Sequence, residues 1–169
     1  MPSETHTVTR VDVHTGVPYA QFVTALEKAA PPFDPGVFEL IDEEGGSWDD
    51  VRDAMAAEAP HHLIRYWRIN ATPALKLAGG SVRSTEYLIG NHVIAESMFR
   101  HDPRALLYAP LRMLVRSDEN GDAIFTMHRP SDEFRSLGNA EVTRVGEVLD
   151  RYVIELLRLC GVDAEADFA

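Results

Sequence analysis

The chain has little cysteine, few aromatic residues and no long apolar run. Its single cysteine, Cys160, cannot form an internal disulfide, and we expect it to be a small buried hydrophobe on the last helix. No stretch approaches the ~20 apolar residues that cross a bilayer. The N-terminal segment also lacks the apolar core of a signal peptide. We therefore expect a cytoplasmic protein with no membrane partner.

Positive charge is scarce as well. The sequence has 16 Lys and Arg against 27 Asp and Glu, a formal net charge of −11 over 169 residues. Nucleic acid phosphates repel such a chain, so we expect no nucleic-acid partner. Glycine-rich phosphate loops, nucleophile elbows and cysteine pairs for zinc are all missing, so no cofactor is expected.

What is present predicts a folded protein. Hydrophobic residues make up 45% and charged residues 25% of the chain, close to a globular average. A chain of this length buries enough surface to fold without a metal or a disulfide. We expect one domain over residues 1–169, with flexible termini at 1–4 and 163–169.

The spacing of apolar residues predicts both strands and helices. Asn120-Gly121 between two apolar runs is a strong hairpin signal. Two segments are ambiguous: 36–41 is a short strand or a buried turn, and 74–78 is a strand or a loose turn. Strands are expected at 5–14, 62–69, 83–89, 107–117 and 122–128, and helices at 18–29, 48–58, 91–101 and 139–160.

The last helix is the clearest element. Asn139 caps its start, one apolar stripe runs along it, and Gly161 is placed to end it. Runs of strands with segregated helices favour an α+β fold with an antiparallel sheet. We expect the long C-terminal helix to lie across one face of that sheet.

Residues 86–116 carry a recognisable pattern. Gly90-Asn91 starts a helix, Asp102-Pro103 ends it, and a strand with Pro110 and Arg112 among apolar residues follows. Together with the hairpin and the long helix, this pattern resembles the domain of unknown function 302 family. The resemblance implies a TBP-like antiparallel sheet (β-α-β4-α), here with extra helices, and a homodimer. The chain departs from the family at His92, where proline is common, and in the longer segment 31–82.

Aromatic and charged side chains on the predicted strands suggest a binding site. A curved sheet crossed by a long helix leaves a groove, and aromatic walls with one or two cations suit a small organic ligand, anionic or aromatic. Tyr66 and Arg68 share one face of their strand, as Tyr108 and Arg112 do of theirs. The candidate ligand-binding residues are Tyr66, Arg68, Glu86, Tyr87, Asn91, His92, Tyr108 and Arg112.

Two other functions remain open at this point. The first is an enzyme in which Glu86, His92 or His101 transfers protons. His92, Glu96 and His101 are also weak metal candidates, because imidazole and carboxylate suit zinc, manganese or iron. The second is a dimeric scaffold without a ligand. A pocket with several ionisable groups favours the enzyme, and a filled groove favours the scaffold.

Overall fold

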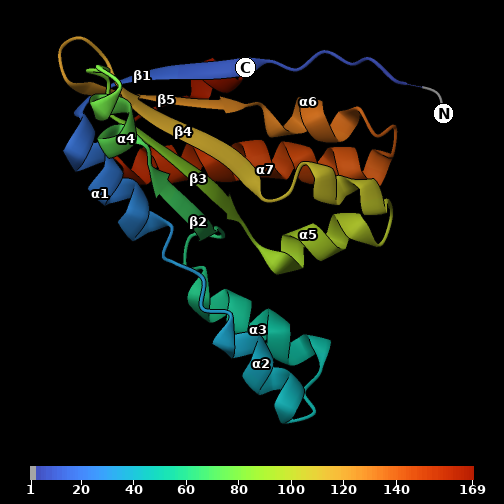
Figure 1. Ribbon diagram of the computed structural model, residues 1–169. Helices are drawn as coiled ribbons and strands as arrows, with labels where there is room; N and C mark the ends of the chain where they lie inside the picture. Colours follow the sequence, from blue (N-terminus) through green and yellow to red (C-terminus); the bar gives the residue numbers. More distant parts are fainter. Residues whose placement is uncertain (1–2) are drawn as a thin grey trace.

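The computed structural model describes residues 3–169 and contains a five-stranded antiparallel sheet (Figure 1). The strands lie in the order β1-β5-β4-β3-β2, so β1 and β2 form the two edges. Every neighbouring pair is antiparallel. The strands are β1 (Arg10–Pro18), β2 (Ile64–Asn70), β3 (Ser84–Gly90), β4 (Leu111–Ser117) and β5 (Asp122–His128).

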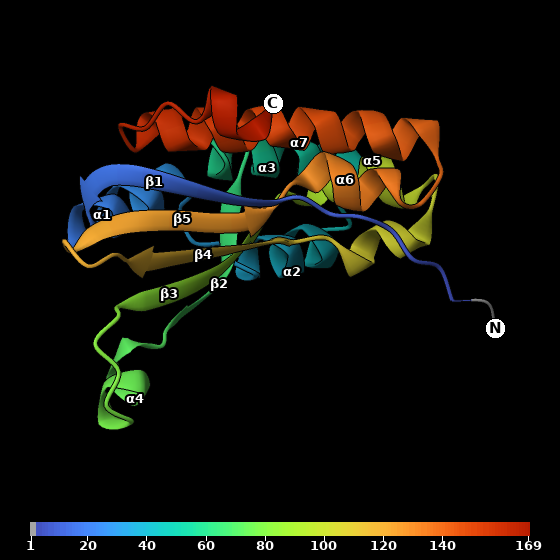
Figure 2. The same cartoon turned by 90° about the horizontal axis from the view of Figure 1, so that it is seen from above.

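The first long helix (Tyr19–Ala29) and the C-terminal helix (Ala140–Leu159) are packed against one face of this sheet. Figure 2 shows α7 on one side of the strands and α4 on the other. The α2–α3 hairpin projects from the rest of the protein (Figure 1), and it packs at its base against the start of β2, where Met55 meets Ile64. The helices are α1 (Tyr19–Ala29), α2 (Gly36–Glu43), α3 (Trp48–Glu58), α4 (Thr72–Leu77), α5 (His92–Phe99), α6 (Pro130–Arg135) and α7 (Ala140–Leu159), with short 3₁₀ helices η1 (Pro103–Leu107) and η2 (Glu165–Phe168).

The alternation of side chains divides the sheet into a buried face and an open face. In β4, Met113 and Val115 are buried, whereas Arg112 is exposed and Leu114 is half-buried. Residues directly opposite each other on paired strands share a face. Tyr87 therefore joins Met113 on the buried face, since the two are paired in register. We call the other side, which carries Arg112, the open face.

The long helix α7 confirms the expectation for the end of the chain. Val142, Leu149, Val153 and Leu156 are buried in the main core. The Asn139 side chain accepts hydrogen bonds from the first free amides of the helix, as its position predicted. The α+β fold with an antiparallel sheet and a long C-terminal helix is therefore confirmed.

Both ambiguous segments are helices, so the expectation of a strand or turn at 36–41 and at 74–78 was wrong. In α2, Val37, Phe38 and Ile41 are half-buried at helical spacing, and Asp34 Oδ1 accepts from the Gly36 amide at 2.9 Å. In α4, Pro73 occupies the first turn, where a missing amide proton costs nothing. A run of six residues is too short to separate these cases by periodicity.

Several element bounds also differ from the expectation. β2 covers Ile64–Asn70 and not 62–69, and α5 covers His92–Phe99 and not 91–101. The first strand starts at Arg10 and continues to Pro18, so α1 begins at Tyr19. Residues 107–110 are not part of a strand, because η1 runs to Leu107 and β4 starts at Leu111. Residues 130–135, expected as loop, form α6, with Phe134 buried in the core.

The C-terminal residues pack on the body of the protein. We expected 163–169 to be a flexible terminus, but Ala164 and Phe168 are buried in the main core. Arg129 Nη1 donates to the Ala169 carbonyl at 3.0 Å. At the other end, residues 3 and 4 are exposed, and 1–2 lie outside the described residues. Among residues 3–169, no helix is long and apolar enough to cross a membrane.

Candidate functional site

A pocket of about 170 Å³ lies where β3 leads into α5 and where β4 begins. One side is formed by α5 and η1, and the core helix α7 contributes Leu149. Almost all of its walls are apolar. The lining residues are Tyr66, Gly90, Asn91, His92, Ile94, Ala95, Met98, Leu106, Ala109, Pro110, Leu111 and Leu149.

Two hydrogen-bonded side chains at this pocket, Tyr66 and His92, make its main polar group. The Tyr66 hydroxyl and His92 Nδ1 are 2.8 Å apart. His92 is the first residue of α5, a position set by the Asn91 cap, whose Oδ1 accepts from the Val93 amide at 2.8 Å. Tyr66 sits at an irregularity of β2 between Arg65 and Trp67. We call these two side chains the Tyr66–His92 pair.

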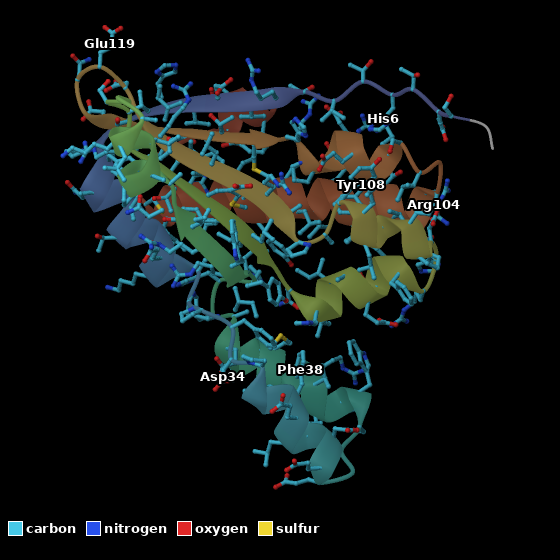
Figure 3. The ribbon with its side chains drawn as sticks, in the orientation of Figure 1. His6, Asp34, Phe38, Arg104, Tyr108 and Glu119 are labelled. Atoms are coloured by element: carbon cyan, nitrogen blue, oxygen red, sulfur yellow. The ribbon has the colours of Figure 1, made fainter. Side chains whose placement is uncertain are left out.

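Two phenylalanines hold this pair in place. The ring of Phe33 lies 5.2 Å from that of Tyr66 and 5.0 Å from that of His92. The ring of Phe38, labelled in Figure 3, meets His92 edge-on at 4.6 Å. Aromatic rings in contact prefer such edge-on and tilted arrangements, so these contacts restrict the orientation of the Tyr66 and His92 rings. Neither phenylalanine was predicted as a site residue, because neither falls on a predicted helix or carries a motif.

Both members of the pair are neutral near pH 7. Burial lowers the pKa of His92 below its ordinary 6.5, so the imidazole stays uncharged. Burial also raises the pKa of Tyr66, which keeps its hydroxyl protonated. No Lys, Arg, Asp or Glu is among the lining residues. The pocket therefore offers no charge to a ligand.

Of the eight candidate ligand-binding residues, the pocket brings together Tyr66, Asn91 and His92. Both polar atoms of the Asn91 side-chain amide already make hydrogen bonds. Its Oδ1 caps α5, and its Nδ2 donates to the His62 carbonyl at 2.9 Å. Asn91 therefore positions His92 rather than offering a free polar group.

Arg68 and Tyr87 lie elsewhere, in an ion-pair network around Glu27 of α1. Arg68 Nε donates to Glu27 Oε1 at 2.5 Å, and the Tyr87 hydroxyl donates to the same oxygen at 3.0 Å. Arg65 Nη1 is 3.0 Å from Glu27 Oε2. Tyr87 is fully buried. These residues join α1 to the edge of the sheet and leave no free cation for a ligand.

Glu86 and Arg112 lie on the open face. Arg112 Nε is 3.3 Å from Glu86 Oε1, and both border a separate hollow of about 340 Å³. Arg68 pairs in register with Tyr87, whereas Arg112 pairs with Leu88. The two arginines thus point to opposite faces of the sheet, and each is tied to a carboxylate. The expectation that the eight candidate residues line one groove was therefore wrong, because its two arginines lie on opposite faces of the sheet.

Tyr108 belongs to a third region, near the N-terminal segment. Its ring packs edge-on against Phe134 at 5.9 Å and against His6 at 6.1 Å. Ser136 Oγ donates to its hydroxyl at 3.3 Å. Figure 3 shows Tyr108 beside His6 and Arg104, apart from Phe38 in the α2–α3 hairpin. Tyr108 is a packing residue and does not line the pocket.

The weak metal candidates do not form a cluster. Glu96 is held by Arg100 on the next turn of α5, with Nε 3.0 Å from Oε1. His92 is bonded to Tyr66, and His101 follows the end of the helix. Within residues 3–169, no group of three His, Cys, Asp or Glu side chains lies close enough to hold a metal ion. Burial raises the pKa of the Cys160 thiol to about 11, so it stays protonated and is a poor nucleophile or metal ligand near neutral pH.

Comparison with known proteins shows the family to which the chain is related. No curated protein matches it. Among solved structures, it is similar to the crystal structure of an uncharacterized conserved DUF302 protein from Bacillus stearothermophilus, with a TM-score of 0.60 and 15% sequence identity. That similarity covers 90% of this chain and 97% of the other, and at this identity it shows the fold alone. The family model of "Domain of unknown function DUF302" matches residues 42–156, so the chain belongs to the DUF302 family.

Proposed function

We propose that the protein binds a small, neutral, mainly apolar organic molecule in the pocket between α5, η1 and α7. The observation that carries this proposal is the lining: apolar side chains with one neutral polar pair. Ligand pockets have this composition, since apolar walls supply affinity and a few polar groups orient the ligand. Burying a charge without a partner is costly, so an anionic ligand is disfavoured here.

The size of the pocket narrows the proposal further. An apolar cavity of about 150 Å³ holds benzene in a well-studied engineered protein, and this pocket measures about 170 Å³. A six-membered ring with one small substituent is therefore the right size. Met98 lies in the wall, and a thioether sulfur makes favourable contacts with aromatic rings.

Filling the pocket should abolish binding. Ala95→Leu adds three carbons at the wall of the pocket and keeps good helix propensity in α5. In the wild type, toluene at ~100 times its dissociation constant should add about 2.7 kcal/mol of stability, read as a thermal shift. In Ala95→Leu that shift should disappear. Ala57→Leu makes the same change on an exposed face of α3 and should retain the full shift. A shift that survives in Ala95→Leu contradicts the proposal.

The alternative of an enzyme receives less support. Of the three proton-transfer candidates, only His92 lines the pocket. Glu86 is on the open face beside Arg112, and His101 lies beyond α5. A general acid or base must reach the same substrate atom or a neighbouring one. The three side chains are not assembled for that task.

Exposed apolar side chains on β2 favour a second function, in which two copies of the chain form a homodimeric scaffold through their open faces. Trp67 is 42% exposed and Ile69 is 45% exposed on β2. Both pair in register with open-face residues of β3, Leu88 and Glu86. A two-fold contact between open faces would cover these apolar side chains.

Sedimentation velocity at micromolar concentration tests the dimer. The wild type should sediment as a dimer, and Ile69→Glu should shift it towards monomer, because a carboxylate is costly to bury in an apolar contact. Leu40→Glu makes a matched change at an exposed position of α2 and should leave the dimer intact. A monomeric wild type would exclude this second function.

A further inference from the structure

We infer that the pocket selects a ring that carries a hydroxyl group, such as a phenol, and that the Tyr66–His92 pair recognises this group. The inference rests on the proposed function and names the class of ligand. Three features of the pair support it: its remaining hydrogen-bonding capacity, its neutral state and its fixed orientation.

The Tyr66–His92 pair has hydrogen-bonding capacity left for a ligand. A tyrosine hydroxyl has one donor and two acceptor lone pairs, and a neutral imidazole has one donor and one acceptor. The bond between Tyr66 and His92 uses one donor and one acceptor. Whichever atom donates, the pair keeps one donor and at least one acceptor. Among residues 3–169, His92 Nε2 makes no hydrogen bond. The Tyr66 hydroxyl accepts one more, from the His92 backbone amide, and the pair still keeps one free donor and one free acceptor.

The chemical groups of possible ligands differ in how well they match this remaining capacity. A hydroxyl both donates and accepts, so it can bond to the free donor or to the free acceptor of the pair, whichever of the two it meets. A methyl group does neither, and leaves them to water or unpaired. A carboxylate only accepts, and it brings a charge for which the pocket has no cationic partner. The hydroxyl is thus the small group that matches the pair.

The pair is also held in place before a ligand binds. His92 is fixed by the Asn91 cap at its backbone and by Phe33 and Phe38 at its ring. Tyr66 is packed against Phe33 and His92. A polar group that is already ordered loses little freedom on binding. Its hydrogen bonds therefore appear as affinity and as discrimination between ligands.

Phenol and toluene test this selectivity, because they have the same shape and differ in hydroxyl against methyl. By isothermal titration calorimetry, the wild type should bind phenol about tenfold more tightly than toluene, the gain of one well-formed hydrogen bond. Benzoate should bind more weakly than either. In the double variant Tyr66→Phe/His92→Phe, the preference for phenol should disappear, while toluene should still bind.

Two further variants keep the test decisive. Tyr66→Phe alone removes one hydroxyl and keeps the ring packing, so it should reduce the preference even if the double variant does not fold. Tyr108→Phe removes a tyrosine hydroxyl outside the pocket and should leave the preference unchanged. Toluene binding as tightly as phenol in the wild type would overturn this inference and leave the proposed function standing. Failure of both ligands to bind the wild type would overturn the proposed function itself.

Discussion

Replacing Leu156 by alanine should lower the free energy of unfolding by about 2–5 kcal/mol. Leu156 lies on the inner face of α7 and is 0% exposed, in the main core between helix and sheet. Truncation removes three buried carbons and leaves a cavity that the packed strands cannot fill by small shifts. Urea or guanidinium denaturation of the wild type and the variant measures this difference directly.

A matched control comes from the same helix. Leu159 is three residues further along α7 and is 49% exposed. Leu159→Ala makes the same chemical change, but it should alter stability by no more than about 0.5 kcal/mol, as exposed substitutions usually do. Equal losses in the two variants would mean that burial does not set the cost, and that α7 does not pack on the sheet through the face described here.

The sequence made α7 and the strands predictable because long periodic elements repeat the same signal many times. The stripe from Val142 to Leu156 spans several helical turns, and each turn gives the same face. The turn around Gly121 added a local signal of its own. Short helices give no such repetition. Tertiary contacts, such as the packing of Phe38 on Phe33 and His92, decide them instead.

The candidate site was only partly predictable, and β2 explains why. In a regular strand, Tyr66 and Arg68 share one face. In the structure, the register shifts between Arg65 and Trp67, so Arg65 pairs with Ile89 and Arg68 pairs with Tyr87. Both arginines consequently lie on the buried face, although they are three positions apart and would point to opposite faces of a regular strand. An irregularity of this kind depends on the neighbouring strand, so one strand's sequence does not predict it.

The pocket itself shows the same limit. Tyr66 and His92 were predicted as candidates because of their chemical types, and the structure brings them together. Their apolar neighbours Met98 and Leu149 read as ordinary core residues in the sequence. A wall of a pocket and a packed core use the same residue types. Only the space left between elements distinguishes the two.

The ion-pair network around Glu27 should make that residue important for stability. Glu27→Ala leaves Arg65 and Arg68 without their acidic partner and removes the acceptor of the Tyr87 hydroxyl. Removing one partner of a largely buried network costs more stability than the network adds. The remaining polar groups stay shielded from water but no longer have the hydrogen bonds that offset their desolvation. We expect a loss of about 2–3 kcal/mol in chemical denaturation near neutral pH. Glu39→Ala, on an exposed part of α2, provides the control and should change stability little.

The pH dependence separates this network from a simple loss of packing. Burial alone would raise the pKa of Glu27, but hydrogen bonds from Arg68, Arg65 and Tyr87 outweigh burial and hold the pKa below its usual 4.5. A carboxyl whose folded-state pKa is lowered contributes stability above its unfolded pKa and loses that contribution as pH falls through the folded value. The stability difference between wild type and Glu27→Ala should therefore be constant near neutral pH and should narrow once the pH falls below about 4.5. A difference that stays constant throughout acidification would mean that the side chain acts through its packing and not through its charge.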